Sequence, residues 1–215
     1  LVSIGALPSS IEDIAIRECI DLVSIDMSFL DSQQLEHLYF RNLNDLTLEI
    51  PSEVSAPNLS SLVIENLMIE GDLFSYLGNS EDLAILSVSY TNLDGEFPSS
   101  ILLLEDLNAL HLDHNNFSGE VPQDLFTLLD DLDSFEIDHN NFSGSISSLL
   151  ETLHSGLYRI ELDNNSFSGD IPNSICDYLD LVSINLDDNS LCGSIPTCLT
   201  DGTYSPYGGW YQDCD

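Results

Sequence analysis

The chain has 215 residues, of which 38 are acidic and three are arginine, with no lysine, so its formal net charge is −35 at pH 7. Clustered Lys and Arg bind phosphate backbones and anionic membrane surfaces, so we exclude both as partners. No apolar run reaches the roughly 20 residues of a membrane span, and we expect no direct membrane insertion in this segment. Such acidity favours a saline or calcium-rich environment or a cationic partner, although solubility alone also explains it.

A repeat of 24 or 25 residues accounts for nearly the whole chain. Its core, LxxLxL, begins at Ile11, Leu35, Leu59, Leu83, Leu107, Leu132, Leu157 and Leu181. Each repeat is a unit that cannot bury its apolar face alone, so stacked repeats share a core and a parallel sheet. We therefore predict an α/β repeat solenoid of about eight coils over residues 1–199, followed by a C-terminal cap over residues 200–215.

The first coils are poorly marked. Residues 1–8 resemble the tail of a preceding coil, and the two coils over residues 11–58 lack the GxIP segment that ends the later ones. No paired-cysteine cap precedes them. We expect that further sequence lies upstream or that another molecule covers this end, because an open sheet edge is a template for association.

The fifth coil carries the most complete pattern. Residues 107–122 read LNALHLDHNNFSGEVP, and the form LxxLxLxxNxFxGxxP recurs in the three following coils. This pattern resembles the plant-type leucine-rich repeat of extracellular proteins. The resemblance implies a horseshoe or superhelix with a parallel concave sheet. It also implies a protein-interaction domain, as in receptor kinase ectodomains, inhibitors of cell-wall-degrading enzymes and secreted wall or surface proteins.

The ninth position of each coil has a structural role in this family, where an inward-turned Asn bonds the backbone of neighbouring coils. The last four coils carry this Asn, and the first four do not: Asn115, Asn140, Asn165 and Asn189, against Cys19, Leu43, Leu67 and Thr91. We expect the N-terminal half to turn differently. We also expect Cys19 to be a small buried core residue.

The other four cysteines lie near the C-terminus, where three connectivities are open. The repeat register places Cys176 and Cys198 on the convex parts of adjacent coils and Cys192 in an outward slot. This favours the pairs Cys176–Cys198 and Cys192–Cys214, the second pinning the cap. Disulfides indicate an oxidising compartment, hence secretion. Zinc binding by these cysteines finds little support, since there is no CxxC pair.

Four Asn-x-Ser sequons also favour an extracellular or cell-surface location, with N-linked glycans attached: Asn58, Asn116, Asn141 and Asn164. Asn116 and Asn141 are the best candidates because each follows the ladder Asn on an exposed turn. Asn164 lies beside the concave sheet, where a glycan would block binding.

Coil positions 3, 5, 7 and 8 are expected to point out from the concave sheet, where function in such proteins lies. The candidate binding residues change from basic to acidic along the chain: Arg17, Arg41, Glu65, His111, Asp113, His114, Glu136, Asp138, His139, Glu161, Asp163, Asp187 and Asp188.

Three interpretations of the aspartate ladder stay open. The charges are solvated and tolerated by a rigid scaffold, or Ca²⁺ lies between neighbouring carboxylates, or a basic ligand lies along the groove. The calcium ligands would be Asp113, Asp138, Asp163 and Asp187. The histidines would add sensitivity to pH. No cofactor is required, and Ca²⁺ is the one candidate.

We do not expect an enzyme, because the acidic pairs lie on an open sheet and no nucleophile elbow, P-loop or HExxH occurs. The leading hypothesis is a secreted structural or adhesive module of an extracellular assembly, dependent on calcium, that binds other extracellular proteins or itself. The alternative is a ligand-recognition domain, either a receptor ectodomain or an inhibitor of an extracellular enzyme, that binds on the acidic concave face.

Overall fold

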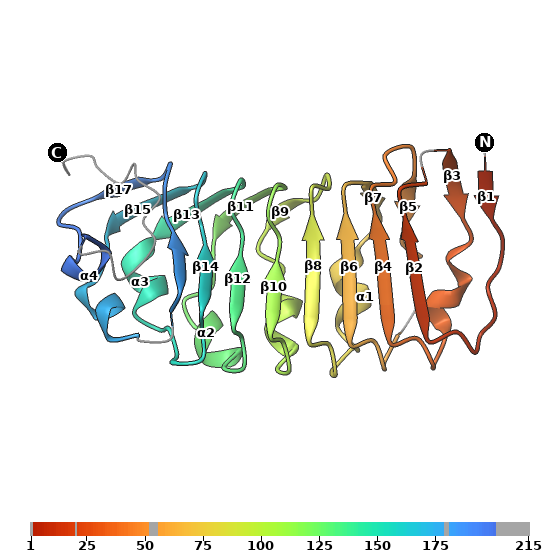
Figure 1. The fold of residues 1–215 in the computed structure, drawn as a ribbon, viewed down its shortest axis with the longest axis horizontal. Helices are drawn as coiled ribbons and strands as arrows, with labels where there is room; N and C mark the ends of the chain where they lie inside the picture. Colours follow the sequence, from red (N-terminus) through yellow and green to blue (C-terminus); the bar gives the residue numbers. More distant parts are fainter. Residues whose placement is uncertain (1, 20, 52–55, 179–180, 201–215) are drawn as a thin grey trace. The chain divides into compact units, whose positions relative to one another are not determined.

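The fold is that of a computed structural model, which describes residues 2–19, 21–51, 56–178 and 181–200. The chain forms two compact units, Leu1–Leu93 with Pro98–Ala109, and Asp94–Phe97 with Leu110–Asp215. Each unit repeats a similar coil, in which a main strand is followed by a turn and a second short strand, and in all described coils but the second by a helical segment (Figure 1).

The first unit contains four parallel main strands, β2 (Asp13–Arg17), β4 (His37–Arg41), β6 (Ser61–Glu65) and β8 (Ile85–Ser89). Their register places equivalent residues opposite one another. Two short sheets pair β1 (Val2–Ile4) with β3 (Leu22–Ile25), and β5 (Thr47–Glu49) with β7 (Met68–Glu70). The helical segments are η1 (Met27–Asp31), α1 (Leu73–Leu77) and η2 (Ser99–Leu103).

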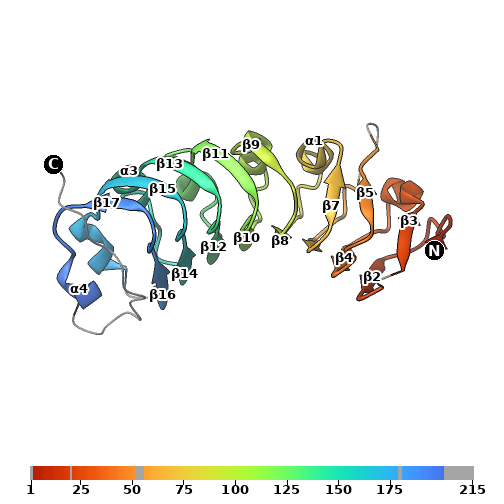
Figure 2. The same cartoon turned by 90° about the horizontal axis from the view of Figure 1, so that it is seen from above.

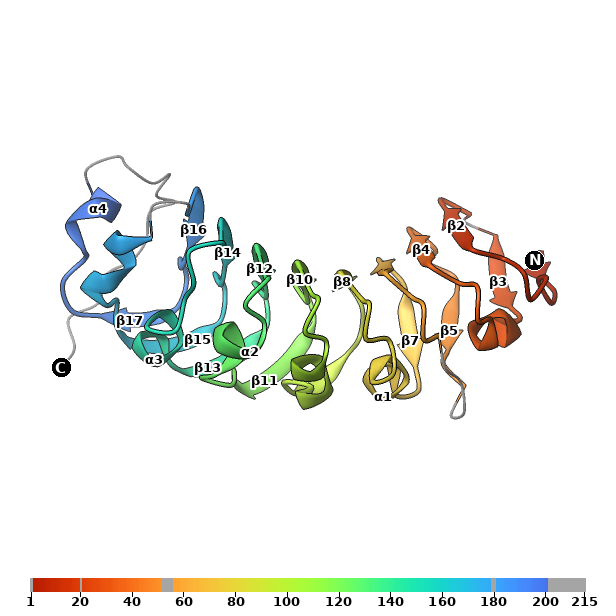
Figure 3. The ribbon, with the colours of Figure 1, turned by 90° about the horizontal axis from the view of Figure 1, so that it is seen from below.

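The second unit has the shorter main strands β10 (Ala109–His111, of which Ala109 belongs to the first unit), β12 (Ser134–Glu136), β14 (Arg159–Glu161) and β16 (Ser183–Asn185). Its second sheet is β9 (Asp94–Glu96), β11 (Asn116–Glu120), β13 (Asn141–Ser145), β15 (Ser166–Asp170) and β17 (Ser190–Cys192). The helices are α2 (Leu125–Leu128), α3 (Ile146–Leu150), η3 (Asn173–Asp177) and α4 (Thr197–Thr200). Figures 2 and 3 show the main strands along one side of this unit and β11, β13 and β15 along the other.

The leucines of the repeat form the core of both units. Inward residues of the main strands, such as Leu38 and Phe40 in the first unit and Phe135 and Ile160 in the second, are at most 1% exposed. Alternate residues of a strand point to opposite faces, so the residues between them face outward. The predicted leucine-rich repeat solenoid with parallel strands is confirmed.

Each coil turns sharply at its eighth residue. That residue has a positive φ of 51° to 58° in every coil: Glu18, Asn42, Asn66, Tyr90, His114, His139, Asn164 and Asp188. Asn, Asp and His adopt this left-handed conformation more readily than most side chains. A second turn needs glycine, as at Gly71, where φ is 103° and an added Cβ would lie 2.6 Å from the Ile50 carbonyl oxygen.

The asparagine ladder of the second unit is confirmed. Asn140 accepts a hydrogen bond from the Phe117 amide at 3.0 Å and donates to the Leu112 and Ile137 carbonyls at 2.9 and 3.1 Å. Asn165 and Asn189 repeat this arrangement one coil later each. The ladder therefore satisfies backbone groups that the turns leave buried.

As expected, the first unit has no asparagine at the ninth position of its coils. Its coils fill or replace that position in two different ways. Leu43 and Leu67 fill the position with buried apolar volume. In the fourth coil Asn92, one residue after Thr91, bonds the Ile69 backbone, accepting at 2.7 Å and donating at 3.0 Å.

The prediction of a buried Cys19 is wrong. Cys19 is an exposed free cysteine whose thiol donates to the Arg17 carbonyl at 3.4 Å. It follows β2, the edge strand of the main sheet, where coils do not enclose the ninth position on both sides. The place of a residue in the repeat therefore does not by itself decide whether the ninth position is buried.

The predicted disulfide Cys176–Cys198 is present, with 5.6 Å between the Cα atoms. It connects η3 with α4 at the end of the second unit. Cys214, and with it the pair Cys192–Cys214 and residues 201–215 of the predicted cap, lies outside the described residues. In the part of the chain that is described, no helix is long and apolar enough to cross a membrane.

Candidate binding face

The outward side chains of the main strands in the second unit, and of the second and third residues after each strand, form one acidic surface. We call this set the acidic face: His111, Asp113, His114, Glu136, Asp138, His139, Glu161, Asp163, Asp187 and Asp188. The structure therefore brings together all of the predicted binding residues that this unit contains.

Backbone hydrogen bonds hold the face in register. The amides of His114, His139 and Asn164 donate to the carbonyls of Asp138, Asp163 and Asp187 at 2.9 to 3.0 Å. Within the strands, Glu136 lies opposite Glu161. Like charges thus recur at the spacing of neighbouring strands, about 4.8 Å.

The central carboxylates are more buried than an open sheet suggests. The side chains of Asp138, Glu161 and Asp163 are 15%, 10% and 12% exposed. Burial raises the pKa of Asp138 to about 6; the hydrogen bond with His139 opposes this, and repulsion from Asp113 and Asp163 adds to it. Burial also raises the pKa of Glu161 and of Asp187. Each charged form is therefore disfavoured in the folded protein, and a bound cation would relieve that cost.

Arg159 is the only Lys or Arg in the sequence of the second unit. Its Nε donates to Glu136 Oε1 at 2.6 Å, and its Nη2 lies 3.3 Å from Glu161 Oε1. Burial alone would lower the pKa of Arg159, but the two carboxylates raise it on balance. Arg159 is not among the binding residues predicted from the sequence, although it occupies an outward third position of its coil.

Two serines also hold carboxylates in place. Ser183 donates to Glu161 Oε1 at 2.9 Å, and Ser134 donates to Glu136 Oε1 at 3.3 Å. Both occupy third positions, as Arg159 does. The signal for all three was therefore present in the repeat register.

The histidines pair with the aspartates. The rings of His114 and His139 stack with centroids 4.0 Å apart and 11° between their planes. His139 Nδ1 lies 2.9 Å from Asp138 Oδ2, and His114 Nδ1 lies 3.3 Å from Asp113 Oδ2. His111 is the last residue of β10, and its Nε2 lies 3.1 Å from Ser134 Oγ and 3.6 Å from Glu136 Oε1.

The predicted residues of the first unit form a different surface. Arg41 Nε lies 3.2 Å from Glu65 Oε2, so these charges form an ion pair. Arg17 is exposed, with its guanidinium carbon 5.9 Å from the centre of the Tyr39 ring. This part of the predicted face is of mixed charge.

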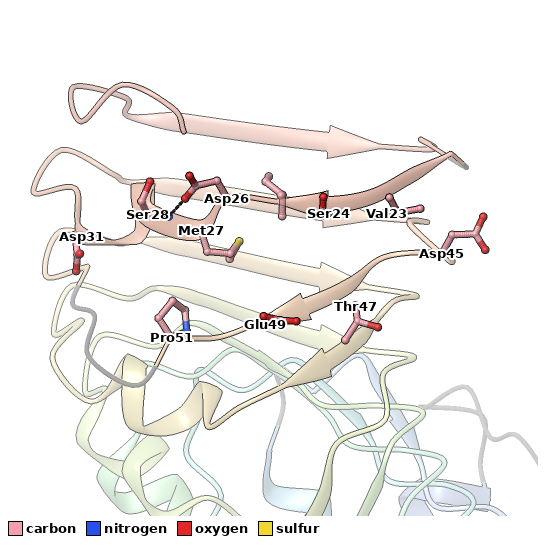
Figure 4. Close-up of a pocket in the computed structure, with 11 residues that line it drawn as sticks. Val23, Ser24, Asp26, Met27, Ser28, Asp31, Asp45, Thr47, Glu49 and Pro51 are labelled. Carbon is pink, nitrogen blue, oxygen red and sulfur yellow. Dashed lines mark hydrogen bonds between the residues drawn. The ribbon is translucent and has the colours of Figure 1, made fainter. Parts of the chain in front are cut away.

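The first unit also contains a hollow that the sequence did not indicate (Figure 4). It lies between β3 and β5, and four carboxylates line it: Asp26, Asp31, Asp45 and Glu49. Asp26 accepts a hydrogen bond from the Ser28 amide at 2.9 Å and caps η1, and this bond lowers the pKa of Asp26. The capping role explains Asp26 without a ligand.

The sequon asparagines differ in their surroundings. Asn116 and Asn141 are exposed at the starts of β11 and β13. Asn58 Nδ2 donates to the Gln33 carbonyl at 2.6 Å, and Asn164 Nδ2 donates to Asp163 Oδ2 at 2.8 Å. Glycosylation stays a prediction at all four, as does calcium binding by the aspartates.

Comparison with known proteins agrees with the coil geometry. The family model of the leucine-rich repeat matches residues 106–128 and 156–178. The chain contains leucine-rich repeats, and it is similar to plant extracellular leucine-rich repeat proteins. Comparison of this leucine-rich repeat protein with curated proteins gives no match.

Solved structures resemble it over most of its length. One is the ectodomain of the receptor kinase GASSHO1/SCHENGEN3 from Arabidopsis thaliana in complex with CASPARIAN STRIP INTEGRITY FACTOR 2, with 24% identity, a TM-score of 0.70, and coverage of 92% of this chain and 27% of that chain. Another is the plant peptide hormone receptor RGFR1 in complex with RGF2, with 23% identity, a TM-score of 0.67, and coverage of 92% and 36%. A plant ice-binding protein has 25% identity, a TM-score of 0.53, and coverage of 85% and 74%. The chain spans about a quarter to a third of the two receptor ectodomains.

Proposed function

We propose that this leucine-rich repeat protein is a non-catalytic extracellular interaction module that binds a cationic polypeptide segment on its acidic face. The observation that carries the proposal is the row of partly buried carboxylates around Asp138, Glu161 and Asp163, which Arg159 only partly neutralises. A Lys or Arg side chain over this row would supply the missing positive charge.

The physical argument is one of complementarity. Carboxylates that are 10% to 15% exposed lie in a lower effective dielectric than those in water, so a cation beside them is attracted more strongly. Charge complementarity also steers encounter and makes association sensitive to salt. Binding of a basic segment should therefore weaken steeply as ionic strength rises.

Two further observations support an extracellular protein-binding role. The disulfide Cys176–Cys198 is typical of an oxidising compartment. One receptor of similar fold is an ectodomain in complex with CASPARIAN STRIP INTEGRITY FACTOR 2, and the other is a peptide hormone receptor in complex with RGF2. The structural or adhesive role, self-association and calcium dependence stay predictions from the sequence.

The test is binding of fluorescent Lys- and Arg-rich peptides, with acidic peptides of equal length for comparison. Glu161→Gln with Asp163→Asn should weaken binding at least tenfold. The matched control, Glu120→Gln with Asp124→Asn, removes two exposed carboxylates of the same unit outside the face and should change it less than twofold. Equal effects of the two variants, or equal binding of basic and acidic peptides, would contradict the proposal.

A further inference from the structure

Three ligand atoms of different residues converge at the start of the acidic face. They are Nδ1 of His114, Oδ2 of Asp138 and Nδ1 of His139, all within 4.8 Å of one another. Over the residues that the structure describes, this is the one group of three or more His, Cys, Asp or Glu with that spacing. Its two imidazoles distinguish it from the surrounding carboxylates.

We propose that His114, Asp138 and His139 bind one divalent transition-metal ion such as Zn²⁺. With bonds of about 2.1 Å, the ligands of a tetrahedral zinc ion lie about 3.4 Å apart. The Asp138 oxygen is already 2.9 Å from one imidazole nitrogen and 3.6 Å from the other. Rotation of the two rings out of their stack toward the Asp138 carboxylate would direct both nitrogens at one ion.

The backbone orders this site in advance. His114 and His139 both have left-handed backbone, with φ of 53° and 52°, and their amides donate to the next coil at 2.9 and 3.0 Å. Their rings stack nearly parallel, so both rings turn out of the stack when their Nδ1 lone pairs point at one ion. Because the backbone of both ligands is already fixed, binding restricts only the side-chain torsions, which favours affinity.

The choice of ligands indicates the class of metal. Imidazole nitrogen suits Zn²⁺, Cu²⁺ and Ni²⁺, whereas Ca²⁺ prefers six to eight oxygen ligands. Asp113 and Asp163 approach the two histidines and add negative charge around the ion. Three protein ligands also leave a position for water or for a side chain of a partner. The inference does not rest on the proposed peptide binding.

The test is calorimetric titration of ZnCl₂ into the full chain after removal of metals with EDTA. We expect one ion per chain and a rise in Tm, because a ligand of the native state stabilises it. His114→Asn with His139→Asn should weaken binding at least thirtyfold. Asn is suited to this conformation, since it occupies the same position in three other coils with positive φ. CaCl₂ should produce no comparable response.

Two controls make the result specific. His37→Asn removes an imidazole from the first unit and Cys19→Ser removes the exposed thiol, and neither should change the affinity for Zn²⁺. Unchanged affinity in the double histidine variant, with its Tm in EDTA preserved, would overturn the proposal, as would an unchanged Tm of the wild type with Zn²⁺. Peptide binding measured in EDTA reports the proposed function separately.

Discussion

The Arg159 guanidinium bonds Glu136 on the neighbouring strand, with 2.6 Å between Nε and Oε1. The two residues come from coils six and seven, so the bond joins adjacent repeats across the sheet. Since Arg159 is the only Lys or Arg of this unit, no other residue of those types there can take its place. The acidic face therefore depends on the single side chain of Arg159 for a permanent positive charge from its own unit.

Replacing Arg159 by Gln should lower the free energy of unfolding by about 1 to 2 kcal/mol, between the values for exposed and buried ion pairs. Glu136 and Glu161 would then face each other without a cation. Urea denaturation measures the change. Arg17→Gln, at an exposed residue of the first unit, is the control and should cost less than about 0.5 kcal/mol. Similar losses in both variants would show that the ion pair contributes little.

The pH dependence of stability should reveal the burial of Glu161. Its folded pKa is raised above the unfolded value, chiefly by burial, so its protonated form stabilises the fold. That contribution is present below the unfolded pKa of about 4.5 and is lost as pH rises through the folded pKa. Glu161→Gln, which keeps an acceptor for Ser183, should therefore be more stable than wild type at pH 7, with the difference shrinking toward pH 4. Thermal melts in EDTA across this range test it, and a difference independent of pH would refute it.

Asn140→Ala should destabilise the second unit by about 1 to 3 kcal/mol, because the buried Phe117 amide loses its Asn140 acceptor and the Leu112 carbonyl keeps only Asn115 of its two asparagine donors. The neighbouring Asn141 is exposed, so Asn141→Ala is a matched control that removes the same atoms one residue later. Chemical denaturation of both variants gives the comparison. Equal denaturation midpoints of the two variants would mean that water can take the place of the Asn140 side chain in these hydrogen bonds.

Much of the fold could be predicted from the sequence because stacking imposes the same inward positions on every coil. The period therefore located the main strands, the Asn ladder from Asn140 onward and the pair Cys176–Cys198. It also placed the outward residues from Glu136 to Asp163 on one surface. These features depend on register alone.

The remaining features depend on three-dimensional surroundings. Cys19 is exposed because its coil ends the sheet, and Asn92 replaces Thr91 in the ladder through a shift of one residue. The burial of Asp138 and Glu161 depends on neighbouring side chains, which a count of outward positions does not give. The convergence of His114 and His139 on one carboxylate likewise requires the left-handed turn of both residues.

Removing the disulfide should destabilise the end of the second unit. Cys176→Ser with Cys198→Ser removes a link between residues 22 positions apart. A disulfide that closes a loop of this length lowers the entropy of the unfolded chain and so stabilises the fold by about 3 kcal/mol. The double variant should therefore unfold at lower urea than wild type, whereas Cys19→Ser, at an exposed free thiol, should leave the midpoint unchanged. Because the link lies in the last coils, hydrogen exchange should rise first at η3 and α4. Uniform faster exchange across the unit would show instead that its coils unfold together.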